Sequence, residues 1–351
     1  MRLYDTPGVQ PIKHLLLDPD ISEIMINGPS RLFIEKQGMM QALSPIFRSA
    51  QQIDLLVENL VAHTGRAVTA KTPFVDFRLP DGSRVNVVIP PIALDGPFVT
   101  IRKATRALQS VEDLVQNGTL SKRMAYFLYV AVSSRLNVLF SGGTATGKTT
   151  LLGLLSAYIP EGERIVVIED TAELELRQAH VVRMECRPPN MEGSGAVTLT
   201  DLLKNSLRMR PTRIILGEIR SDEAFEMLNA MSSGHEGCLA VLHASSPMHA
   251  VSRLEMMVLT RGLPFPMWAI QRQIASAVHL IVQCALLRDG TRRVTHISEV
   301  AGIQNDQVQL NDIYQFDETF SCTGTRPRFF DKLVRTAGAD TVATLLEPGT
   351  D

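Results

Sequence analysis

The sequence of 351 residues has few cysteines, few aromatic side chains and no long apolar run. The cysteines stand far apart, with no C-x-x-C pair among them, at Cys186, Cys238, Cys284 and Cys322. This spacing argues against a zinc ribbon or a redox dithiol and predicts reduced, buried thiols. The least polar stretch, residues 274–287, contains His279 and Gln283 and is too short to span a bilayer.

Neither sign of charge dominates, because 35 Lys and Arg stand against 37 Asp and Glu and leave a net charge of −2. No basic stripe and no cluster of basic and aromatic residues marks a nucleic-acid surface, so no nucleic-acid partner is expected. Residues 1–20 lack the apolar core of a secretory signal, and no polybasic tail suggests a membrane anchor. We therefore expect a cytoplasmic protein whose membrane association comes through partners. The length favours two domains.

Residues 1–103 are predicted to form a small mixed α/β domain. A turn at Asn27-Gly28-Pro29 separates two alternating strands, and Asp81-Gly82 lies at the turn of a second hairpin. Residues 49–63, which end before Gly65, carry apolar side chains at helical spacing. A further strand covers residues 98–103. Residues 104–120 are expected to be a linker with a short helix.

From residue 121 to residue 351, helices alternate with apolar strands, which predicts an α/β domain with a mainly parallel sheet. Strands are expected at residues 137–140, 164–170, 213–219, 238–243 and around 279–287, with a hairpin turn at Asp289-Gly290. Helices are expected up to residue 135, at residues 148–158, 199–209 and 221–231, and twice beyond Pro247. The strands are almost wholly β-branched or aliphatic, so helices should cover both faces of the sheet.

A Walker A pattern, Gly142-x-x-x-x-Gly147-Lys148-Thr149, follows the first of these strands and opens a helix. Its glycines let backbone N–H groups approach phosphates, and the helix N-terminus favours anions. Lys148 should bridge the β- and γ-phosphates, and the Thr149 hydroxyl should bind Mg²⁺. The sequence thus predicts a site for ATP and Mg²⁺ that uses Gly142, Gly143, Thr144, Ala145, Thr146, Gly147, Lys148, Thr149 and Thr150.

Two further strands end in acids that could serve this site. The strand at residues 213–219 carries Gly217, where a Walker B Asp could stand, followed by Glu218. The strand at 164–170 ends in Glu169 and Asp170. Carboxyl ends of parallel strands face the crevice in which open α/β sheets bind ligands. Glu218 and Glu169 are therefore candidates both to polarise the attacking water and to hold the metal.

Two histidines, His235 and His243, flank the strand at residues 238–243. They should lie at opposite ends of that strand, which argues against joint ligation of a metal. His243, at the carboxyl end, is the better candidate to sense the γ-phosphate, although a structural role is the alternative.

In their order, GGTATGKTT, RIVVIEDTAELEL, RIILGEIR and GHEGCLAVLHASSP resemble the secretion-ATPase superfamily of type II and type IV secretion, type IV pili and conjugation. EIMINGPSRLFIEKQG, VDFRLPDGSRVNVVIPP, HVVRMECRPPN and TRRVTHISEVAGI are most similar to the CpaF/TadA-type ATPases of Tad/Flp pilus assembly. The resemblance implies a RecA-like P-loop NTPase domain with a mainly parallel sheet, preceded by a smaller, PAS-like α/β domain. Many members carry a longer N-terminal extension, whose interactions are not expected here.

The resemblance also implies a homo-hexameric ATPase that works with inner-membrane platform proteins at the inner face of that membrane. In the family, arginines of the N-terminal domain reach the phosphates, and the matching positions are Arg78, Arg84 and Arg102. A guanidinium can donate paired hydrogen bonds to phosphate oxygens. The leading hypothesis is thus a motor for Tad/Flp pilus assembly. The alternatives are a conjugation or type IV secretion motor, a nucleic-acid translocase, and a scaffold that binds ATP but scarcely hydrolyses it.

Overall fold

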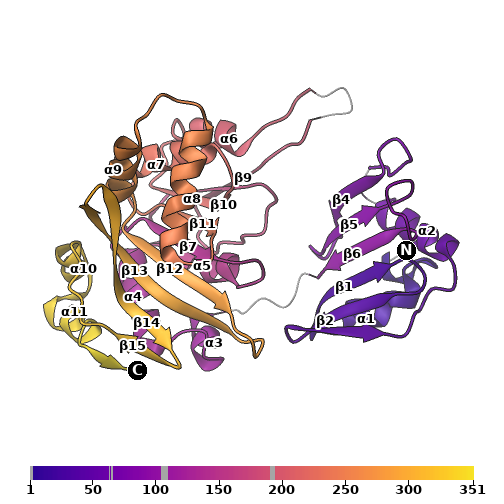
Figure 1. Ribbon diagram of the computed structural model, residues 1–351, viewed down its shortest axis with the longest axis horizontal. Coiled ribbons are helices and arrows are strands. Elements are labelled where there is room, and N and C mark those ends of the chain that lie inside the picture. Colours follow the sequence, from indigo (N-terminus) through magenta and orange to yellow (C-terminus); the bar gives the residue numbers. More distant parts are fainter. Residues whose placement is uncertain (1–2, 63, 65, 104–109, 190–193) are drawn as a thin grey trace. The chain divides into compact units, whose positions relative to one another are not determined.

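The computed structural model describes residues 3–62, 64, 66–103, 110–189 and 194–351. The chain divides into two compact units, residues 1–107 and 108–351 (Figure 1). The expected end of the first long helix, at residues 63 and 65, and residues 104–109 of the expected linker lie outside the described residues. In the part of the chain that is described, no helix is long and apolar enough to cross a lipid bilayer.

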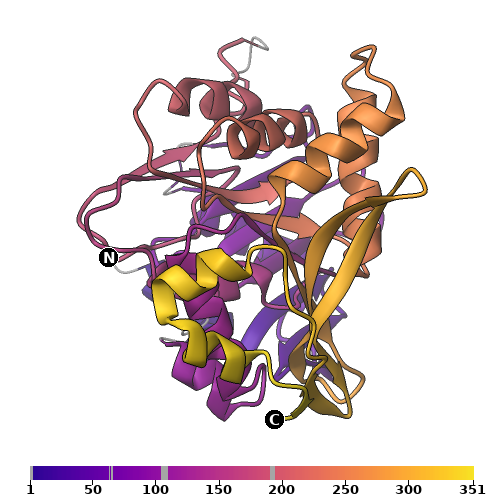
Figure 2. The ribbon, with the colours of Figure 1, turned by 90° about the vertical axis from the view of Figure 1, so that its left-hand side faces the viewer.

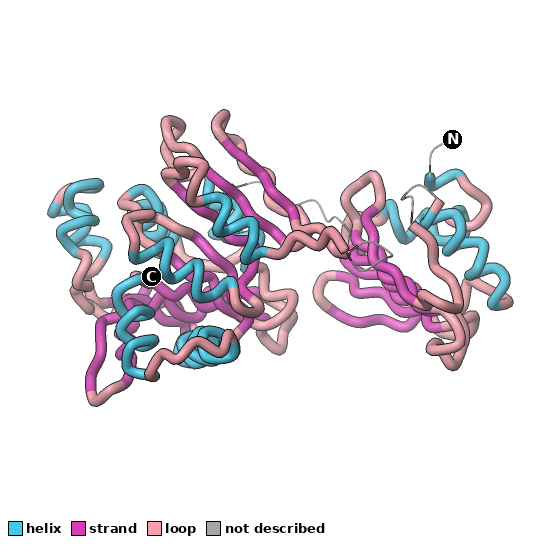
Figure 3. Tube along the Cα trace, turned by 90° about the horizontal axis from the view of Figure 1, so that it is seen from above, coloured by secondary structure: helices cyan, strands magenta, loops and turns pink. Residues whose placement is uncertain are grey.

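The first unit is an antiparallel sheet with helices on one side (Figure 3). Its strands are β1 (Ile21–Asn27), β2 (Leu32–Lys36), β3 (Met39–Leu43), β4 (Phe74–Arg78), β5 (Arg84–Val88) and β6 (Phe98–Arg102), in the order β3-β2-β1-β6-β5-β4. The helical elements are η1 (Leu3–Asp5), η2 (Gln10–Ile12), α1 (Lys13–Leu17) and α2 (Ala50–Val61). Both predicted hairpins are present, and the mixed α/β character of this unit is confirmed.

Buried and less buried side chains alternate along the strands of this sheet, and the buried ones lie on the face that α2 covers. Val85 and Val87 of β5 are buried in one core with Leu56 and Leu60 of α2. Residues between these positions, including Arg84, point to the opposite face, because successive side chains of a strand alternate. The face of β4, β5 and β6 away from α2 is therefore not part of this core, and Arg84 lies on it.

The second unit contains one large mixed sheet in the order β16-β15-β14-β13-β12-β7-β11-β10-β8-β9. Its strands are β7 (Val138–Gly142), β8 (Ile165–Glu169), β9 (Val181–Glu185), β10 (Arg213–Ile219), β11 (Leu239–His243), β12 (Leu280–Leu286), β13 (Arg292–Gln304), β14 (Gln307–Asp317), β15 (Thr319–Cys322) and β16 (Gly349–Thr350). The strands from β12 to β9 in this order are parallel, and β13 to β16 extend the sheet in antiparallel fashion. The predicted parallel sheet is confirmed, with a longer antiparallel extension than the sequence indicates.

Helices cover both faces of this sheet, as the apolar strands predict. They are α3 (Val111–Gln116), α4 (Lys122–Ser133), α5 (Lys148–Ser156), α6 (Leu199–Ser206), α7 (Glu223–Ser232), α8 (Pro247–Thr260), α9 (Met267–Ala277), α10 (Phe330–Ala337) and α11 (Ala339–Leu345). One core joins α4, α5, α10 and α11 to one face, and another joins α6 to α9 to the other. Both α10 and α11 lie against α4 (Figure 2).

Helix α3 packs within the second unit, although the sequence places it in a linker. It contacts α4 and α5, and Val111 and Leu114 are buried in the same core as those helices. A capping box at Ser110 and Asp113 starts the helix, with both reciprocal hydrogen bonds formed. The second unit therefore begins before residue 121.

Candidate nucleotide site

The Walker A loop connects β7 to α5, with each end held by a glycine that cannot be replaced without a clash or strain. All five residues of β7 are buried, so the strand is fixed on both faces. A Cβ on Gly142 would lie 2.4 Å from the carbonyl oxygen of Cys284, on the neighbouring strand β12. Gly147 precedes α5 with a left-handed φ of +88°, which favours glycine. These contacts explain why this loop needs glycine at its first and last positions.

Backbone N–H groups of the loop are available for a ligand. Among the described residues, the N–H groups of Thr144, Ala145, Thr146 and Gly147 have no hydrogen-bond acceptor. Lys148 is buried, and its Nζ donates to the carbonyl oxygen of Gly143 at 2.5 Å. A run of open N–H groups beside a buried ammonium at a helix N-terminus suits an anionic phosphate chain.

The neighbouring strand β11 brings His243 to the start of this loop, where it pairs with Gly142 in the sheet register. Its Nε2 lies 3.6 Å from Oε2 of Glu218. Burial and the charge of Lys148 lower the pKa of His243, so its imidazole is neutral at pH 7. His235 lies at the other end of β11, so the two histidines do not converge, as the sequence predicts.

Glu218 owes its position to a β-bulge. Between the pairs Leu216–Ala240 and Ile219–Leu242, two residues of β10 lie opposite one residue of β11. Such a bulge changes the direction of a side chain and is common next to active sites. Glu218 is mostly buried, and its Oε1 lies 2.5 Å from Nη2 of Arg220. Arg220 also contacts Asp170 at 3.0 Å, so a single arginine links Glu218 of β10 to the acid that follows β8.

Glu169 is the last residue of β8, and only one of the two oxygens of its buried carboxylate accepts hydrogen bonds from the described residues. Its Oε1 accepts hydrogen bonds from the N–H groups of Glu173 at 2.8 Å and Leu174 at 3.0 Å. Its Oε2 is buried and has no hydrogen-bond partner among the described residues. Burial raises the pKa of the Glu169 carboxyl, which is the direction that makes a carboxylate a better proton acceptor.

The Glu169 carboxylate explains why Gly217, rather than an Asp, stands at the Walker B position. A Cβ on Gly217 would lie 2.8 Å from Cγ of Glu169, closer than nonbonded carbon atoms approach. Any side chain at position 217 would therefore displace Glu169. Glu169 of the adjacent strand β8 thus occupies the space that a side chain at position 217 of β10 would take.

Mg²⁺ fits this donor set, because it prefers oxygen ligands and is usually held by one or two protein groups together with phosphates. Thr149 lies half-buried in the first turn of α5 and offers a hydroxyl, and the partnerless Oε2 of Glu169 offers a carboxylate oxygen. Within the described residues, no group of three or more His, Cys, Asp or Glu side chains is arranged to hold a metal ion by itself. Thr144 in the loop and Thr150 in the first turn of α5 are exposed.

In the first unit, the three predicted arginines form a row. Arg84 on β5 pairs with Arg78 on β4 and with Arg102 on β6, so three neighbouring strands carry a guanidinium at the same level. Nε and Nη2 of Arg78 are buried and have no partner among the described residues. Arg102 lies near a carboxylate, with its Nε 3.9 Å from Oε1 of Glu23. Adjacent like charges are unfavourable on a sheet, so this row suits an anionic ligand.

Comparison with known proteins identifies the chain's family. The family model of the type II/IV secretion system protein matches residues 5–329. The chain belongs to this family. The conjugal transfer protein TrbB of Rhizobium radiobacter is 32% identical over 323 residues, which cover 90% of this chain and 95% of TrbB. An uncharacterized protein of Methanocaldococcus jannaschii is 41% identical over 235 residues, 64% of this chain and only 32% of that protein's length.

Among solved structures, the ATPase DotB of Legionella pneumophila matches with a TM-score of 0.59 at 20% identity, over 84% of this chain and 82% of that chain. This likeness confirms the two-domain α/β architecture with a RecA-like second domain. Membership of the type II/IV secretion family, together with a complete Walker A loop, makes the chain an ATPase.

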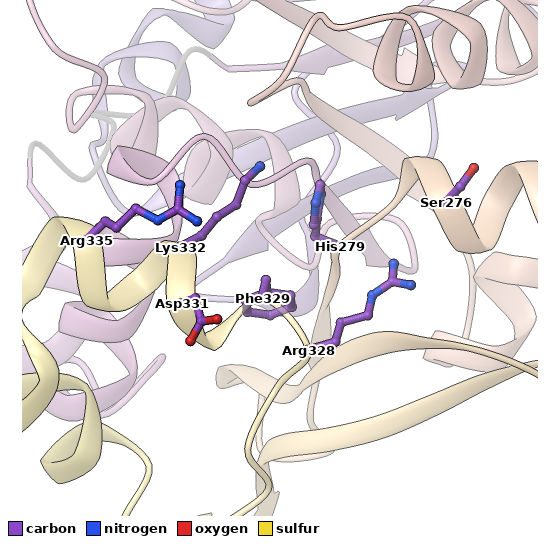
Figure 4. Close-up of a pocket in the computed structure, with 7 residues that line it drawn as sticks. All are labelled: Ser276, His279, Arg328, Phe329, Asp331, Lys332 and Arg335. Atoms are coloured by element: carbon purple, nitrogen blue, oxygen red, sulfur yellow. The ribbon is translucent and has the colours of Figure 1, made fainter.

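A separate pocket of about 410 Å³ lies between α10 and the end of α9 (Figure 4). It is lined by Ser276, His279, Arg328, Phe329, Asp331, Lys332 and Arg335. His279 precedes β12, which runs parallel to β7, so the pocket faces the amino ends of the strands and the Walker A loop faces their carboxyl ends. Lys332 pairs with Glu236 at 2.9 Å, and Arg328 donates to the carbonyl oxygen of Ala275. The pocket is thus distinct from the nucleotide site of this ATPase, and these two cations already have partners.

Two arginines at the nucleotide site were not among the predicted residues. Arg220 follows the Walker B strand directly, so its place after Glu218 is the signal that could have found it. Arg292 opens β13, and its Nε donates to the carbonyl oxygen of Ala145 in the Walker A loop at 2.8 Å. No motif marks Arg292, because it reaches the loop through the pairing of distant strands.

Proposed function

We propose that the chain hydrolyses MgATP at the loop between β7 and α5 and that this hydrolysis powers a secretion machine. The observation that carries the proposal is the loop itself, with open N–H groups and buried Lys148, together with the carboxylates Glu218 and Glu169 on the neighbouring strands β10 and β8 of the same sheet. This set supplies what phosphoryl transfer needs, namely positioning and charge stabilisation with a group that orients water.

The carboxylates have different surroundings and take different roles in this proposal. Oε2 of Glu169 accepts no hydrogen bond from the described residues and belongs to a carboxyl of raised pKa, so it is the atom that accepts a proton from the attacking water. Both oxygens of Glu218 face cationic or polar groups, Arg220 and His243, so Glu218 orients water or metal instead. When bound, Mg²⁺ neutralises phosphate charge, and the Thr149 hydroxyl with Glu218 is the set that would hold it.

The motor is proposed to act as a homo-hexamer at the cytoplasmic face of the inner membrane, on platform proteins of the machine. The name of TrbB, a conjugal transfer protein, supports a conjugation or type IV secretion motor. The match to a family of type II/IV secretion proteins is compatible with either that role or Tad/Flp pilus assembly. Tad/Flp assembly therefore stays a prediction from motif resemblance. The arginine row of the first unit is proposed to complete the site by contacting phosphates.

Replacing Glu218 by Gln tests the proposed chemistry, because Gln keeps the shape of the side chain and removes its charge. We expect MgATP affinity within about threefold of wild type and turnover lower by about two orders of magnitude, the scale of a lost acid-base or orienting group. Both quantities are measured on the full chain, the affinity by calorimetric titration with a non-hydrolysable MgATP analogue and the turnover by phosphate release.

Glu255→Gln is the matched control, since Glu255 is a carboxylate of α8 outside the site and should leave both quantities unchanged. Unchanged turnover in Glu218→Gln would remove Glu218 from the chemistry. A parallel loss of affinity and turnover would show that Glu218 mainly binds metal.

A further inference from the structure

The hairpin between β12 and β13 lies beside the Walker A loop, outside every motif of the sequence. β12 runs along β7, with Cys284 paired to Gly142. β7 ends at this residue, whereas β12 continues to Leu286, which pairs with Arg292 across the turn at Asp289-Gly290. The first residue of β13 is thereby placed alongside the loop rather than alongside β7.

Arg292 contacts the loop through both its stem and its guanidinium. Nε donates to the carbonyl oxygen of Ala145 at 2.8 Å, and Cδ lies 3.4 Å from the place that a Cβ on Gly147 would take. Among the described residues, no carboxylate forms an ion pair with Arg292. Its polar contact is thus the loop carbonyl, which distinguishes it from an ordinary surface arginine.

The loop needs an outside contact at this point because Ala145 has a left-handed φ of +61°. For a residue other than glycine this conformation costs about 1 kcal/mol or more. A hydrogen bond from a cationic donor to the carbonyl oxygen of the same residue offsets such a cost.

That hydrogen bond also orients the next N–H group. In a trans peptide, the carbonyl oxygen and the following N–H lie in one plane and point in opposite directions. With the carbonyl of Ala145 directed at Arg292, the N–H of Thr146 points away from Arg292. This N–H is one of the loop donors that have no acceptor among the described residues.

We propose that Arg292 is a positioning residue of the Walker A loop, which holds the Ala145–Thr146 peptide so that its N–H faces a nucleotide phosphate. The inference rests on the proposed function, in which the loop binds nucleotide phosphates. Because the loop wraps phosphates that ADP and ATP share, Arg292 acts on binding of both nucleotides. It therefore changes affinity and KM more than kcat.

The test compares full-length variants in their affinity for MgADP, measured by calorimetric titration. Arg292→Met keeps an unbranched stem without donor or charge, and we expect its Kd to rise about tenfold, the scale of a lost hydrogen bond to a charged group. Arg292→Lys restores a charged donor and should stay within about threefold of wild type. Arg288→Met removes the same charge from the exposed part of the same hairpin and should stay within about twofold.

Steady-state ATPase measurements give a second readout, in which KM for MgATP rises with Kd in Arg292→Met while kcat changes less than about threefold. Arg292 is exposed, so the unfolding temperature of the variants without nucleotide should lie within about 4 °C of wild type, the shift that about 1 kcal/mol produces in a chain of this size. Wild-type affinity in Arg292→Met, or an equal loss in Arg288→Met, would overturn the inference while leaving the proposed function intact. A wild-type chain that binds no MgADP would instead contradict the proposed function, and the inference with it.

Discussion

Replacing Glu169 by Gln is expected to abolish most of the ATPase turnover while the fold is kept. The amide oxygen can continue to accept the N–H groups of Glu173 and Leu174, and the amide NH₂ takes the place of Oε2, the atom without a partner. What is lost is a proton acceptor next to the phosphates. Such a loss lowers kcat by about 10²- to 10⁴-fold, or about 3–5 kcal/mol in the barrier.

Glu169→Gln should lower the turnover without lowering the stability of the fold. Burial raises the pKa of Glu169, so the folded chain is most stable with this carboxyl protonated and loses that stability as the pH rises through the raised pKa. At neutral pH, Glu169→Gln should thus unfold at the same temperature as wild type or higher. Glu169→Ala instead leaves two N–H groups without acceptors, at about 1–3 kcal/mol each.

The assay is phosphate release at saturating MgATP, followed across pH, with calorimetric unfolding of the same samples. Wild-type kcat should rise with pH through the raised pKa of Glu169, and the residual activity of Glu169→Gln should lack that rise. Glu175→Gln makes the same chemical change on an exposed side chain of the same loop and is the matched control. Turnover of Glu169→Gln within about threefold of wild type would refute the reasoning and leave Glu169 as a clamp for its loop.

Two further predictions follow from contacts at β10 and from the arginine row. Gly217→Ala should destabilise the chain by about 1–3 kcal/mol and reduce turnover, because the new Cβ displaces Glu169. Gly162→Ala is the control and should change neither quantity, because no atom lies within 4 Å of its Cβ. Equal unfolding temperatures of the two variants would contradict the packing argument. If Arg84 serves a neighbouring subunit, inactive Arg84→Ala and Lys148→Ala chains should regain part of their turnover when mixed, and no recovery in proven mixed rings would show that Arg84 serves its own subunit.

The Walker A loop could be predicted from the sequence because its determinants are local. A buried strand, glycines that begin and end the loop, and Lys148 at a helix N-terminus all lie within a short segment of the chain. The strand at residues 213–219 has its predicted bounds, since the apolar run Ile214–Leu216 marks a strand buried on both faces.

Features that depend on the pairing of distant strands could not be predicted in this way. Gly217 looks like a missing Asp in the sequence, and only the register of β8 against β10 shows that Glu169 fills its place. The bulge that turns Glu218 towards His243 leaves no local signal either. The role of Arg292 could not be predicted either, because its contact with Ala145 joins residues far apart in the chain.

Weak amphipathic patterns explain the elements that the sequence analysis missed or misplaced. β9 is an edge strand with no fully buried residue, so its sequence lacks the apolar run of β8. α3 is six residues long and buries only Val111 and Leu114, which is too few for a helical pattern to assign it to a core.

The central claim, that this Walker A loop is where the chain hydrolyses ATP, is tested most directly by phosphate release from full-length Lys148→Ala. Lys148 is the buried cation of the loop, and its loss removes the main positive partner of a triphosphate in both binding and turnover. We expect no measurable turnover in a variant whose unfolding temperature equals that of wild type. Turnover at the wild-type rate would contradict the assignment of the site.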